Sequence, residues 1–424
     1  MRVKINDKNN FINMFNQLFT HNKIDKINSI SIDSRIIERD DIYIPIKGIN
    51  YDGHDFISSA LESGATICFS EKKNKHKKVI NSTSNIEIIK ILASEWKQRT
   101  KTKIIGITGS NGKTTTKELL YKILSNNYKC SKNNGNYNSL IGLPLSFMNS
   151  NIDDDYCILE YGANHPHEID LLCKIVKPDY SLITNISDAH IGNYKDLNEI
   201  IETKIAIYNN LNNNGIAFIN KNIKEIKNIK LHCKLVEFNT AKTPNLNIKI
   251  PSALKHLKDI LLSSFVIAEY FGVDYNVIND NINSFTLPTG RGQITNIKGL
   301  KIIDDSYNAN PASVTLGINR LSNFNNIGKK VLIFGDMLEL GKNNYEKHKS
   351  IAQIIDNSKI NILLTFGNLS EITSKNIKNN KISTQHCNDY QTLVEYIKKN
   401  LTTNDIIYIK GSRSMHLNKI IEKL

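Results

Sequence analysis

Short apolar runs alternate along this chain with longer segments whose hydrophobic residues follow the spacing of a helix. A short continuous apolar run is typical of a strand that is buried on both faces. Runs of this kind stand at residues 104–108, 157–161, 180–185, 216–220, 301–303, 331–334, 362–366 and 406–409. Because helical segments separate them, the chain is predicted to form βαβ units, in which helices cover both faces of a parallel sheet.

These runs fall into two groups, and weaker strand signals at 30–32 and 42–46 precede them. A turn-rich segment, 287–292, lies between the two groups. A chain of 424 residues also exceeds one ordinary hydrophobic core. We therefore predict an α/β protein with a small N-terminal domain, a central parallel-sheet domain and a smaller, Rossmann-like C-terminal domain. The expected boundaries are 1–84, 85–286 and 287–424.

The composition is ordinary for a globular protein, with 40% hydrophobic and 23% charged residues. No apolar run approaches the roughly 18 residues that suggest a membrane span. The first residues lack the apolar core of a signal peptide, so we expect a cytoplasmic protein. The six cysteines are scattered without a CxxC pair, which argues against disulfides and against a structural zinc site.

The net charge of +14 raises the possibility of a nucleic-acid partner. The lysines, however, are spread along the whole chain among asparagine and isoleucine and form no basic stripe. We therefore expect no nucleic acid, and a general attraction for small anionic substrates instead.

A glycine-rich turn directly follows the run 104–108 and precedes a helical pattern. Glycines allow backbone N–H groups to face a phosphate, and the start of a helix adds positive potential. In this arrangement a lysine reaches the terminal phosphates and the next hydroxyl can bind Mg²⁺. The alternative is a plain strand-to-helix turn, since the common phosphate loop has a glycine where Ile107 stands. The residues of the turn are Thr108, Gly109, Ser110, Asn111, Gly112, Lys113, Thr114 and Thr115.

Three residues after the neighbouring strands are further candidates. Glu160 stands at the end of the strand that begins with residues 156–159, where a carboxylate can hold Mg²⁺ beside a phosphate loop or merely face water. His190 follows the next strand as a second metal ligand, a phosphate contact or a structural residue. Lys204 falls within an apolar helical stripe. It either extends its amine to water or lies near the phosphate site, uncharged or carbamylated.

The C-terminal strands also end in polar strings, at 304–311, 335–341 and 410–413. The first contains two carboxylates, several amides and a tyrosine, which suits a contact with a nucleotide or a metal-bound phosphate better than a simple turn. Pro311 and Ser313 then suit the start of a helix. Because parallel strands end at one edge of a sheet, the three strings are predicted to share a rim.

With these motifs, the chain resembles the Mur ligases of peptidoglycan synthesis over nearly its whole length. The turn 108–115 is similar to the ATP loop of that family, which accounts for the missing glycine at Ile107. The strings at 160–165 and 305–311 favour the member that adds D-alanyl-D-alanine. Further similar segments lie at 33–35, 47–48, 52–56, 135–138, 141–144, 335–341 and 410–414.

The resemblance implies an N-terminal domain that binds a uridine nucleotide, an ATP-binding centre and a C-terminal ligase domain. It implies a monomeric, ATP- and Mg²⁺-dependent ligase that adds D-alanyl-D-alanine to UDP-N-acetylmuramoyl-tripeptide through an acyl phosphate. The implied catalytic residues are Lys113, Glu160, His190 and a carbamylated Lys204, and the implied metal ligands are Thr114, Glu160, His190 and Lys204. Nucleotide contacts would come from the turn 108–115, Arg291 and Asp305. Substrate contacts would come from Ser34, Arg35, Lys47, Asn136, Asn138, Asn308 and Asn310.

Two departures from the family pattern stand out. The adenine-side helix of the family opens with His-Asn and a second Asn three residues later, whereas His256 here precedes Leu257 and the later position is Ile260. The stretch 222–252 is short and is expected to form a trimmed part of the central domain. Another Mur-type ligase, adding the third amino acid or resembling folylpolyglutamate synthase, remains an alternative. A degenerate phosphate-loop protein that only binds nucleotide is another.

Overall fold

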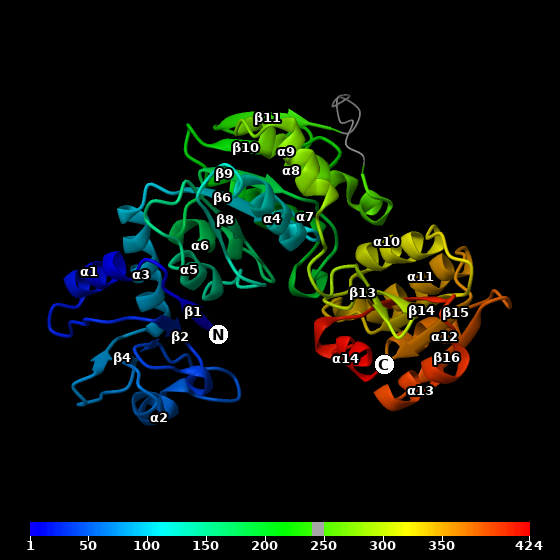
Figure 1. The fold of residues 1–424 in the computed structure, drawn as a ribbon, viewed down its shortest axis with the longest axis horizontal. Helices are drawn as coiled ribbons and strands as arrows, with labels where there is room; N and C mark the ends of the chain where they lie inside the picture. The colour runs from blue at the N-terminus through cyan, green and yellow to red at the C-terminus, as the bar shows by residue number, and fades with distance from the viewer. Residues whose placement is uncertain (240–249) are drawn as a thin grey trace.

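The computed structural model describes residues 1–239 and 250–424, which form three sheets with their own helices. Figure 1 shows the sheets in chain order, with the central one between the two others. Residues 240–249, which belong to the stretch expected to be trimmed, lie outside the described residues.

The N-terminal sheet has the strand order β1-β2-β3-β4-β5, antiparallel between β1 and β2 and parallel elsewhere. The predicted strand at 42–46 is shorter than expected, because Pro45 has no N–H to continue the ladder. The strands are β1 (Arg2–Lys4), β2 (Ser29–Ser31), β3 (Ile42–Tyr43), β4 (Ile67–Ser70) and β5 (Val79–Asn81). The helices are α1 (Lys8–Leu18), α2 (Ile57–Glu62) and α3 (Asn85–Arg99), with 3-10 turns η1 (Ser34–Ile36) and η2 (Gly53–Phe56).

The central sheet is parallel throughout, in the order β11-β10-β9-β6-β8-β7. The chain leaves β6 toward one edge and later returns to its other side, so the strand order reverses at β6. In open α/β sheets ligands bind at such a reversal, beyond the carboxyl ends of the strands. The strands are β6 (Lys103–Thr108), β7 (Cys130–Lys132), β8 (Tyr156–Glu160), β9 (Tyr180–Ile183), β10 (Ile216–Asn220) and β11 (Lys234–Phe238).

Helices cover both faces of the central sheet, as predicted. On β6, Ile105 and Ile107 face one helical layer and Ile104 faces the other, the alternation that a strand imposes. The first layer consists of α4 (Lys113–Leu124), α8 (Lys258–Tyr270) and α9 (Tyr275–Asn283). The second consists of α5 (Gly142–Phe147), α6 (Glu168–Ile175) and α7 (Leu197–Asn209). The 3-10 turns are η3 (Ile191–Asn193) and η4 (Ser252–Leu257).

The C-terminal sheet has the order β12-β13-β17-β14-β15-β16, antiparallel only between β12 and β13. Its two faces carry separate apolar clusters, under α10 and α11 on one side and α13 and α14 on the other. The strands are β12 (Gln293–Ile297), β13 (Leu300–Asp305), β14 (Lys330–Gly335), β15 (Ile362–Phe366), β16 (Ser383–Cys387) and β17 (Ile406–Lys410). The helices are α10 (Pro311–Ser322), α11 (Asn344–Asp356), α12 (Ser370–Lys375), α13 (Tyr390–Asn400) and α14 (Asn418–Lys423), with 3-10 turns η5 (Gly341–Asn343) and η6 (Arg413–Met415).

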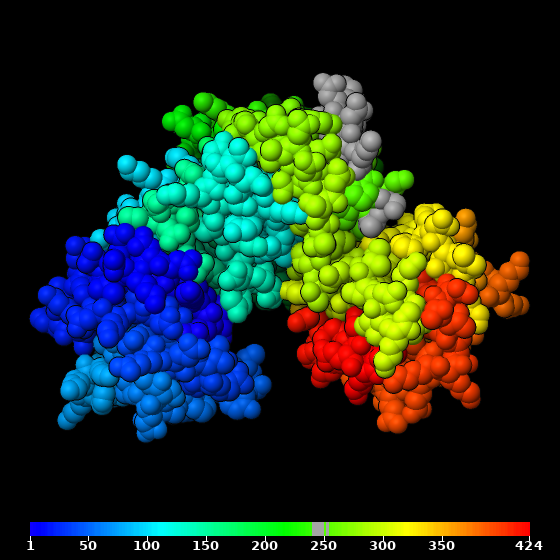
Figure 2. Space-filling model, viewed as in Figure 1, coloured from blue at the N-terminus to red at the C-terminus, as the bar shows by residue number. Residues whose placement is uncertain are grey.

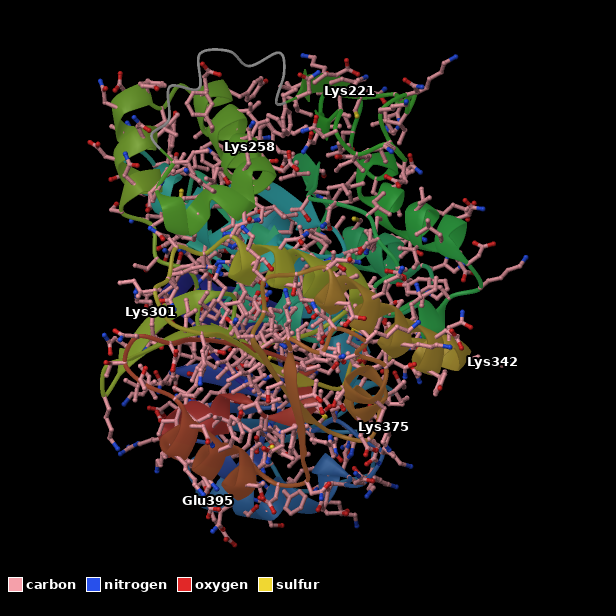
Figure 3. The ribbon with its side chains drawn as sticks, turned by 90° about the vertical axis from the view of Figure 1, so that its right-hand side faces the viewer. Lys221, Lys258, Lys301, Lys342, Lys375 and Glu395 are labelled. Carbon is pink, nitrogen blue, oxygen red and sulfur yellow. The ribbon has the colours of Figure 1, made fainter. Side chains whose placement is uncertain are left out.

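The two outer domains lie on either side of the central one, and Figure 2 shows a wide hollow between them. Lysines labelled in Figure 3 belong to separate elements, among them α8, β13 and α12, so positive charge is dispersed on that side of the molecule. Within residues 1–239 and 250–424, no helix has the length and apolar character needed to cross a membrane.

Candidate active site

The glycine-rich turn connects β6 to α4 at the reversal of the central sheet. Gly109 has a φ of 148° and Gly112 a φ of 82°, conformations that side chains rarely adopt. A Cβ on Gly109 would lie 2.0 Å from the hydroxyl of Thr184, so no other residue fits there. The turn therefore has the geometry of a phosphate loop, with the N-terminus of α4 at its end.

The loop after β9 holds this turn in place. The backbone N–H of Asn111 donates to the side-chain oxygen of Asn185 at 2.7 Å, and Ser110 Oγ donates to the carbonyl of Ser187 at 3.0 Å. Thr184 Oγ1 donates to the carbonyl of Asn111 at 2.6 Å. The cradle is thus preorganised by the protein itself.

Lys113 is the first residue of α4, and its ammonium lies over the turn, donating to the carbonyl of Gly109 at 2.8 Å. Burial lowers the pKa of Lys113, Glu160 opposes that shift, and the charge of Arg291 adds to it. Arg291 comes from the C-terminal segment, so two domains contribute charge to one place. Such a concentration of positive charge suits a polyanion such as the phosphates of ATP.

Glu160 ends β8 and faces the same helix. Thr114 Oγ1 donates to one carboxylate oxygen of Glu160 at 2.6 Å, and Asn138 Nδ2 donates to the other at 2.7 Å. Glu160 is 2% exposed, so these partners matter for keeping a buried carboxylate. A hydroxyl and a carboxylate fit Mg²⁺, which usually takes few protein oxygens and completes its shell with phosphate and water. The described residues hold no cluster of three or more His, Cys, Asp or Glu side chains suited to a metal.

Lys204 lies on α7 and is 5% exposed, so its predicted core-facing position is confirmed. Burial lowers its pKa to about 7, and the charge of Lys113 contributes to the shift. Much of this amine is therefore neutral near pH 7. His190 lies beyond β9, where its Nδ1 contacts Glu339 of the C-terminal domain. Among the described residues, no hydrogen bond or ion pair joins His190 to Lys204 or Glu160.

The rim of the C-terminal sheet faces the phosphate loop. Asn310 Nδ2 donates to the side-chain oxygen of Asn111 at 2.8 Å. Asn310 also caps α10 through reciprocal hydrogen bonds with Ser313, and Pro311 is the first helical residue, as predicted. Next to it, the Arg291 guanidinium stacks 3.8 Å above the ring of Tyr307. The predicted shared rim thus contacts the glycine-rich turn of the central domain.

Asp305 sits deeper on this rim. Its carboxylate accepts hydrogen bonds from Lys410 Nζ at 2.6 Å and from Tyr408 Oη at 2.7 Å. The Lys410 ammonium also donates to the carbonyl of Asn308 at 3.0 Å. Lys410 and Tyr408 escaped prediction as partners because only the insertion of β17 beside β13 brings them to Asp305.

The predicted substrate residues of the N-terminal domain lie apart from the phosphate loop. Ser34 and Arg35 are on η1, where the Arg35 guanidinium pairs with Asp33 at 2.7 Å and stays exposed. Lys47 is exposed and forms a backbone bridge with Asp52. Asn136, a predicted substrate residue of the central domain, is exposed at the tip of the loop after β7. The substrate-binding roles of these residues remain predictions.

The position of the second missing asparagine adjoins the phosphate loop. A Cβ on Gly112 would lie 2.8 Å from Cδ1 of Ile260, so the isoleucine side chain packs on the turn. Leu257 is partly buried against the apolar cluster of α8. An apolar contact thus replaces whatever polar contact an asparagine would make there.

Comparison with known proteins agrees with this geometry. The descriptions "Mur ligase family, catalytic domain", "Mur ligase middle domain" and "Mur ligase, glutamate ligase domain" match residues 26–99, 107–297 and 290–413. A relative from Buchnera aphidicola, curated as UDP-N-acetylmuramoyl-tripeptide–D-alanyl-D-alanine ligase, is 34% identical over 94% of this chain and 92% of its own. The chain belongs to the Mur ligase family. A relative of the same name from Borreliella burgdorferi is 30% identical over 99% of both chains.

Solved structures of Mur ligases share this architecture. The MurF ligase from Thermotoga maritima in complex with ADP superposes with a TM-score of 0.79 at 26% identity, covering 93% of this chain and 96% of that one. A MurF structure from Acinetobacter baumannii reaches a TM-score of 0.84 at 23% identity over 97% and 98% of the two chains, which supports the fold. The predicted α/β class with three domains is therefore confirmed.

Proposed function

We propose that this chain joins D-alanyl-D-alanine to UDP-N-acetylmuramoyl-tripeptide, converting ATP to ADP and phosphate and forming the UDP-muramoyl-pentapeptide of peptidoglycan synthesis. The curated relatives carry that name over nearly the full length of the chain. The ATP-dependent part of this reaction is supported above all by the 2.6 Å contact between Thr114 and Glu160 beside Lys113. It joins a phosphate loop to a buried carboxylate at the end of the neighbouring strand.

The first chemical step must bring two anions together. A carboxylate oxygen of the tripeptide attacks the γ-phosphorus of ATP, the bond to the β-phosphate oxygen breaks, and ADP leaves. Lys113 and the N-terminus of α4 lower the repulsion between these groups, and Arg291 adds positive charge from the other domain. The product is an acyl phosphate.

The amine of D-alanyl-D-alanine then attacks the acyl carbon, loses a proton and displaces phosphate, which leaves an amide. Water competes with that amine, so the C-terminal domain must close over the phosphate loop. The bond between Asn310 and Asn111 is a contact of this kind. Asn308 and Asn310 are proposed to meet the incoming dipeptide from the same rim.

We propose that Thr114 and Glu160 hold one Mg²⁺, and that His190 and Lys204 hold a second. When bound, these ions would neutralise phosphate charge and polarise the phosphoryl group. The pKa of Lys204, about 7, supports carbamylation, because only a neutral amine reacts with carbon dioxide. The modified side chain would be an anion, which a buried metal site needs.

The remaining site residues are assigned either to ATP or to the UDP-linked substrate. The loop 108–115, Arg291 and Asp305 are proposed to bind ATP. Ser34, Arg35 and Lys47 are proposed to bind the uridine end of the substrate, and Asn136 and Asn138 its peptide end. We also propose a monomer that works in the cytoplasm, where ATP is available.

The test measures phosphate release from ATP with UDP-N-acetylmuramoyl-tripeptide, with and without D-alanyl-D-alanine. We expect release to require the dipeptide and to cease in Lys113→Ala. The matched control is Lys122→Ala on the same helix, whose ammonium donates to the carbonyl of Ser284 away from the loop. Circular dichroism checks that both variants fold.

Each of the other possible outcomes would support a different conclusion about function. Release that ignores the dipeptide would point to another Mur-type ligase, and binding of ATP without release would point to a degenerate nucleotide-binding protein. Normal turnover by Lys113→Ala would contradict the site assignment.

A further inference from the structure

Lys117 is a lysine with no exposed surface, one turn after Lys113 on α4. Its ammonium donates to the carbonyl of Asn133 at 2.5 Å and to that of Gly135 at 3.1 Å, and lies 3.2 Å from a carboxylate oxygen of Glu118. Burial lowers the pKa of Lys117. Since desolvating a charge is costly, a lysine in this position indicates a specific task for its three N–H donors.

The two carbonyls belong to one loop, residues 133–138, which follows β7. The other side of this loop is attached to β8. Asn133 Oδ1 accepts the backbone N–H of Glu160 at 2.9 Å, and Asn138 donates to the Glu160 carboxylate at 2.7 Å. The loop therefore lies between the phosphate helix and the carboxylate that faces Thr114.

The loop also has little freedom at its base. Asn133 Nδ2 donates to the carbonyl of Tyr137 at 2.9 Å, which closes the loop on itself. A Cβ on Gly162 would lie 2.6 Å from the side chain of Asn138, so that side chain is enclosed. At the tip, by contrast, Gly135 has open space around it and Asn136 is exposed. Within residues 1–239 and 250–424, Lys117 alone joins the carbonyl of Gly135 to α4.

We propose that Lys117 is a positioning residue that couples the phosphate helix to the loop 133–138. This proposal rests on the proposed function, in which that loop receives the peptide end of the acyl donor. Lys117 holds the tip at a set distance from Lys113, so the loop keeps the shape that binds the peptide end of the donor beside the phosphate helix. It acts through the loop and touches neither substrate.

The test uses the full chain with Lys117→Met, which keeps the length of the side chain and removes its donors. We expect the KM for UDP-N-acetylmuramoyl-tripeptide to rise about ten- to hundredfold, because hydrogen bonds to charged groups are among the stronger ones. The KM for ATP should stay within about twofold, since Lys113 and its turn keep their own contacts. Lys122→Met on the same helix is the control and should leave both constants unchanged.

A double-mutant cycle with Asn138→Ala separates positioning from general damage. If Lys117 acts through the loop, the two changes should be non-additive in the KM for the tripeptide substrate. Hydrogen exchange of residues 133–138 should accelerate in Lys117→Met. An unchanged KM, an equal rise in the KM for ATP, or additive effects would overturn the proposal.

Folding failure is also decisive. If Lys117→Met does not fold, Lys117→Gln is measured instead; its side chain is shorter but retains two N–H donors, so the rise in KM should be smaller and equally selective. Failure of both variants to fold would assign Lys117 a purely structural role and overturn the proposal. Should the wild type show no dipeptide-dependent release, the proposed function fails, while hydrogen exchange still tests the coupling between Lys117 and the loop.

Discussion

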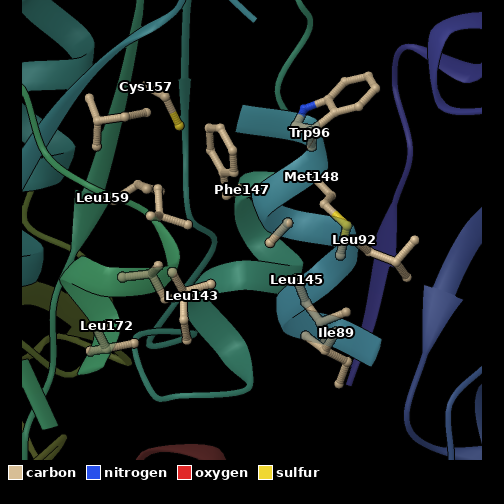
Figure 4. Packing of buried hydrophobic residues seen from close by; sticks show 14 of the residues in the cluster. Ile89, Leu92, Trp96, Leu143, Leu145, Phe147, Met148, Cys157, Leu159 and Leu172 are labelled. Atoms are coloured by element: carbon tan, nitrogen blue, oxygen red, sulfur yellow. The ribbon is translucent and has the colours of Figure 1, made fainter. Parts of the chain in front are cut away.

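The two junctions between domains differ in chemistry, since one is apolar and the other is polar. Figure 4 shows Ile89, Leu92 and Trp96 of α3 beside Leu145 and Phe147 of α5. These residues belong to one apolar cluster that runs from the N-terminal sheet into the central one. At the other junction, the central and C-terminal domains have separate clusters and meet through polar side chains and backbone.

The polar junction consists of few contacts. Asp188 pairs with Lys347, and His190 contacts Glu339. The backbone N–H of Gly192 donates to the carbonyl of Glu339 at 3.1 Å. A shared apolar core resists separation, whereas exposed polar contacts are readily exchanged for water. The first two domains are therefore expected to move as one body and the third to move against them at the ATP site.

The largest effect is expected in the apolar junction. Trp96→Ala should cost about 3–5 kcal/mol of stability, because Trp96 is fully buried and its indole N–H donates to Ser150. In urea, the circular dichroism transitions of the first two domains should shift together.

Trp96 is the single tryptophan of the chain, so its fluorescence reports on this junction alone. Leu332→Ala, in the core of the C-terminal domain, should leave that fluorescence transition in place. A fluorescence shift in this control as large as the circular dichroism shift in Trp96→Ala would mean that both junctions are rigid.

A smaller effect is expected where two backbones cross at the polar junction. A Cβ on Gly192 would lie 2.5 Å from the backbone nitrogen of Gly341, and backbone cannot yield as a flexible side chain can. Gly192→Ala should therefore hold the domains apart and lower kcat/KM by about a hundredfold, as expected for displaced reacting groups. X-ray scattering should show a larger radius of gyration with an unchanged melting temperature. An unchanged radius of gyration would show that the close approach of Gly192 and Gly341 does not set the spacing of the two domains.

The smallest effect concerns the ion pair between Asp188 and Lys347. Both side chains are partly exposed, so Lys347→Ala should weaken the junction by only about 0.2–1 kcal/mol. The change is measured as the coupling energy in a double-mutant cycle with Asp188→Ala, using kcat/KM at low and high salt. The coupling should fade as salt increases. Salt-independent coupling would indicate a more buried contact than the structure has.

The sequence predicted the inner strands of the two larger sheets and missed the outer ones. The missed strands are β7 and β11 in the central sheet and β12 and β16 in the C-terminal one, and all four are edge strands. An inner strand is buried on both faces and has to be apolar, whereas an edge strand faces water and needs no apolar run. Ser383–Cys387, for example, is mostly polar and partly exposed.

The candidate site was also predictable only in part. Some candidate residues are defined by their neighbours in the sequence, such as Thr114 after Lys113 or Asn310 before Pro311. These could be predicted from short motifs. The pairing of Asp305 with Lys410 and of His190 with Glu339 depends on strand order and domain contact, which no local pattern encodes. Lys117 could have been suspected from its four-residue spacing to Lys113, but its carbonyl partners lie in a separate loop.

The bond between Asn310 and Asn111 has a consequence for the balance of conformations. A hydrogen bond between two neutral amides contributes only about 0.5–1.5 kcal/mol net, so by itself it favours the closed arrangement by about twofold to thirteenfold. Open and closed populations of comparable size can be shifted by any ligand that contacts both partners. Bound ATP would supply that difference in affinity, and loss of its γ-phosphate would return the molecule to the open population and release the product.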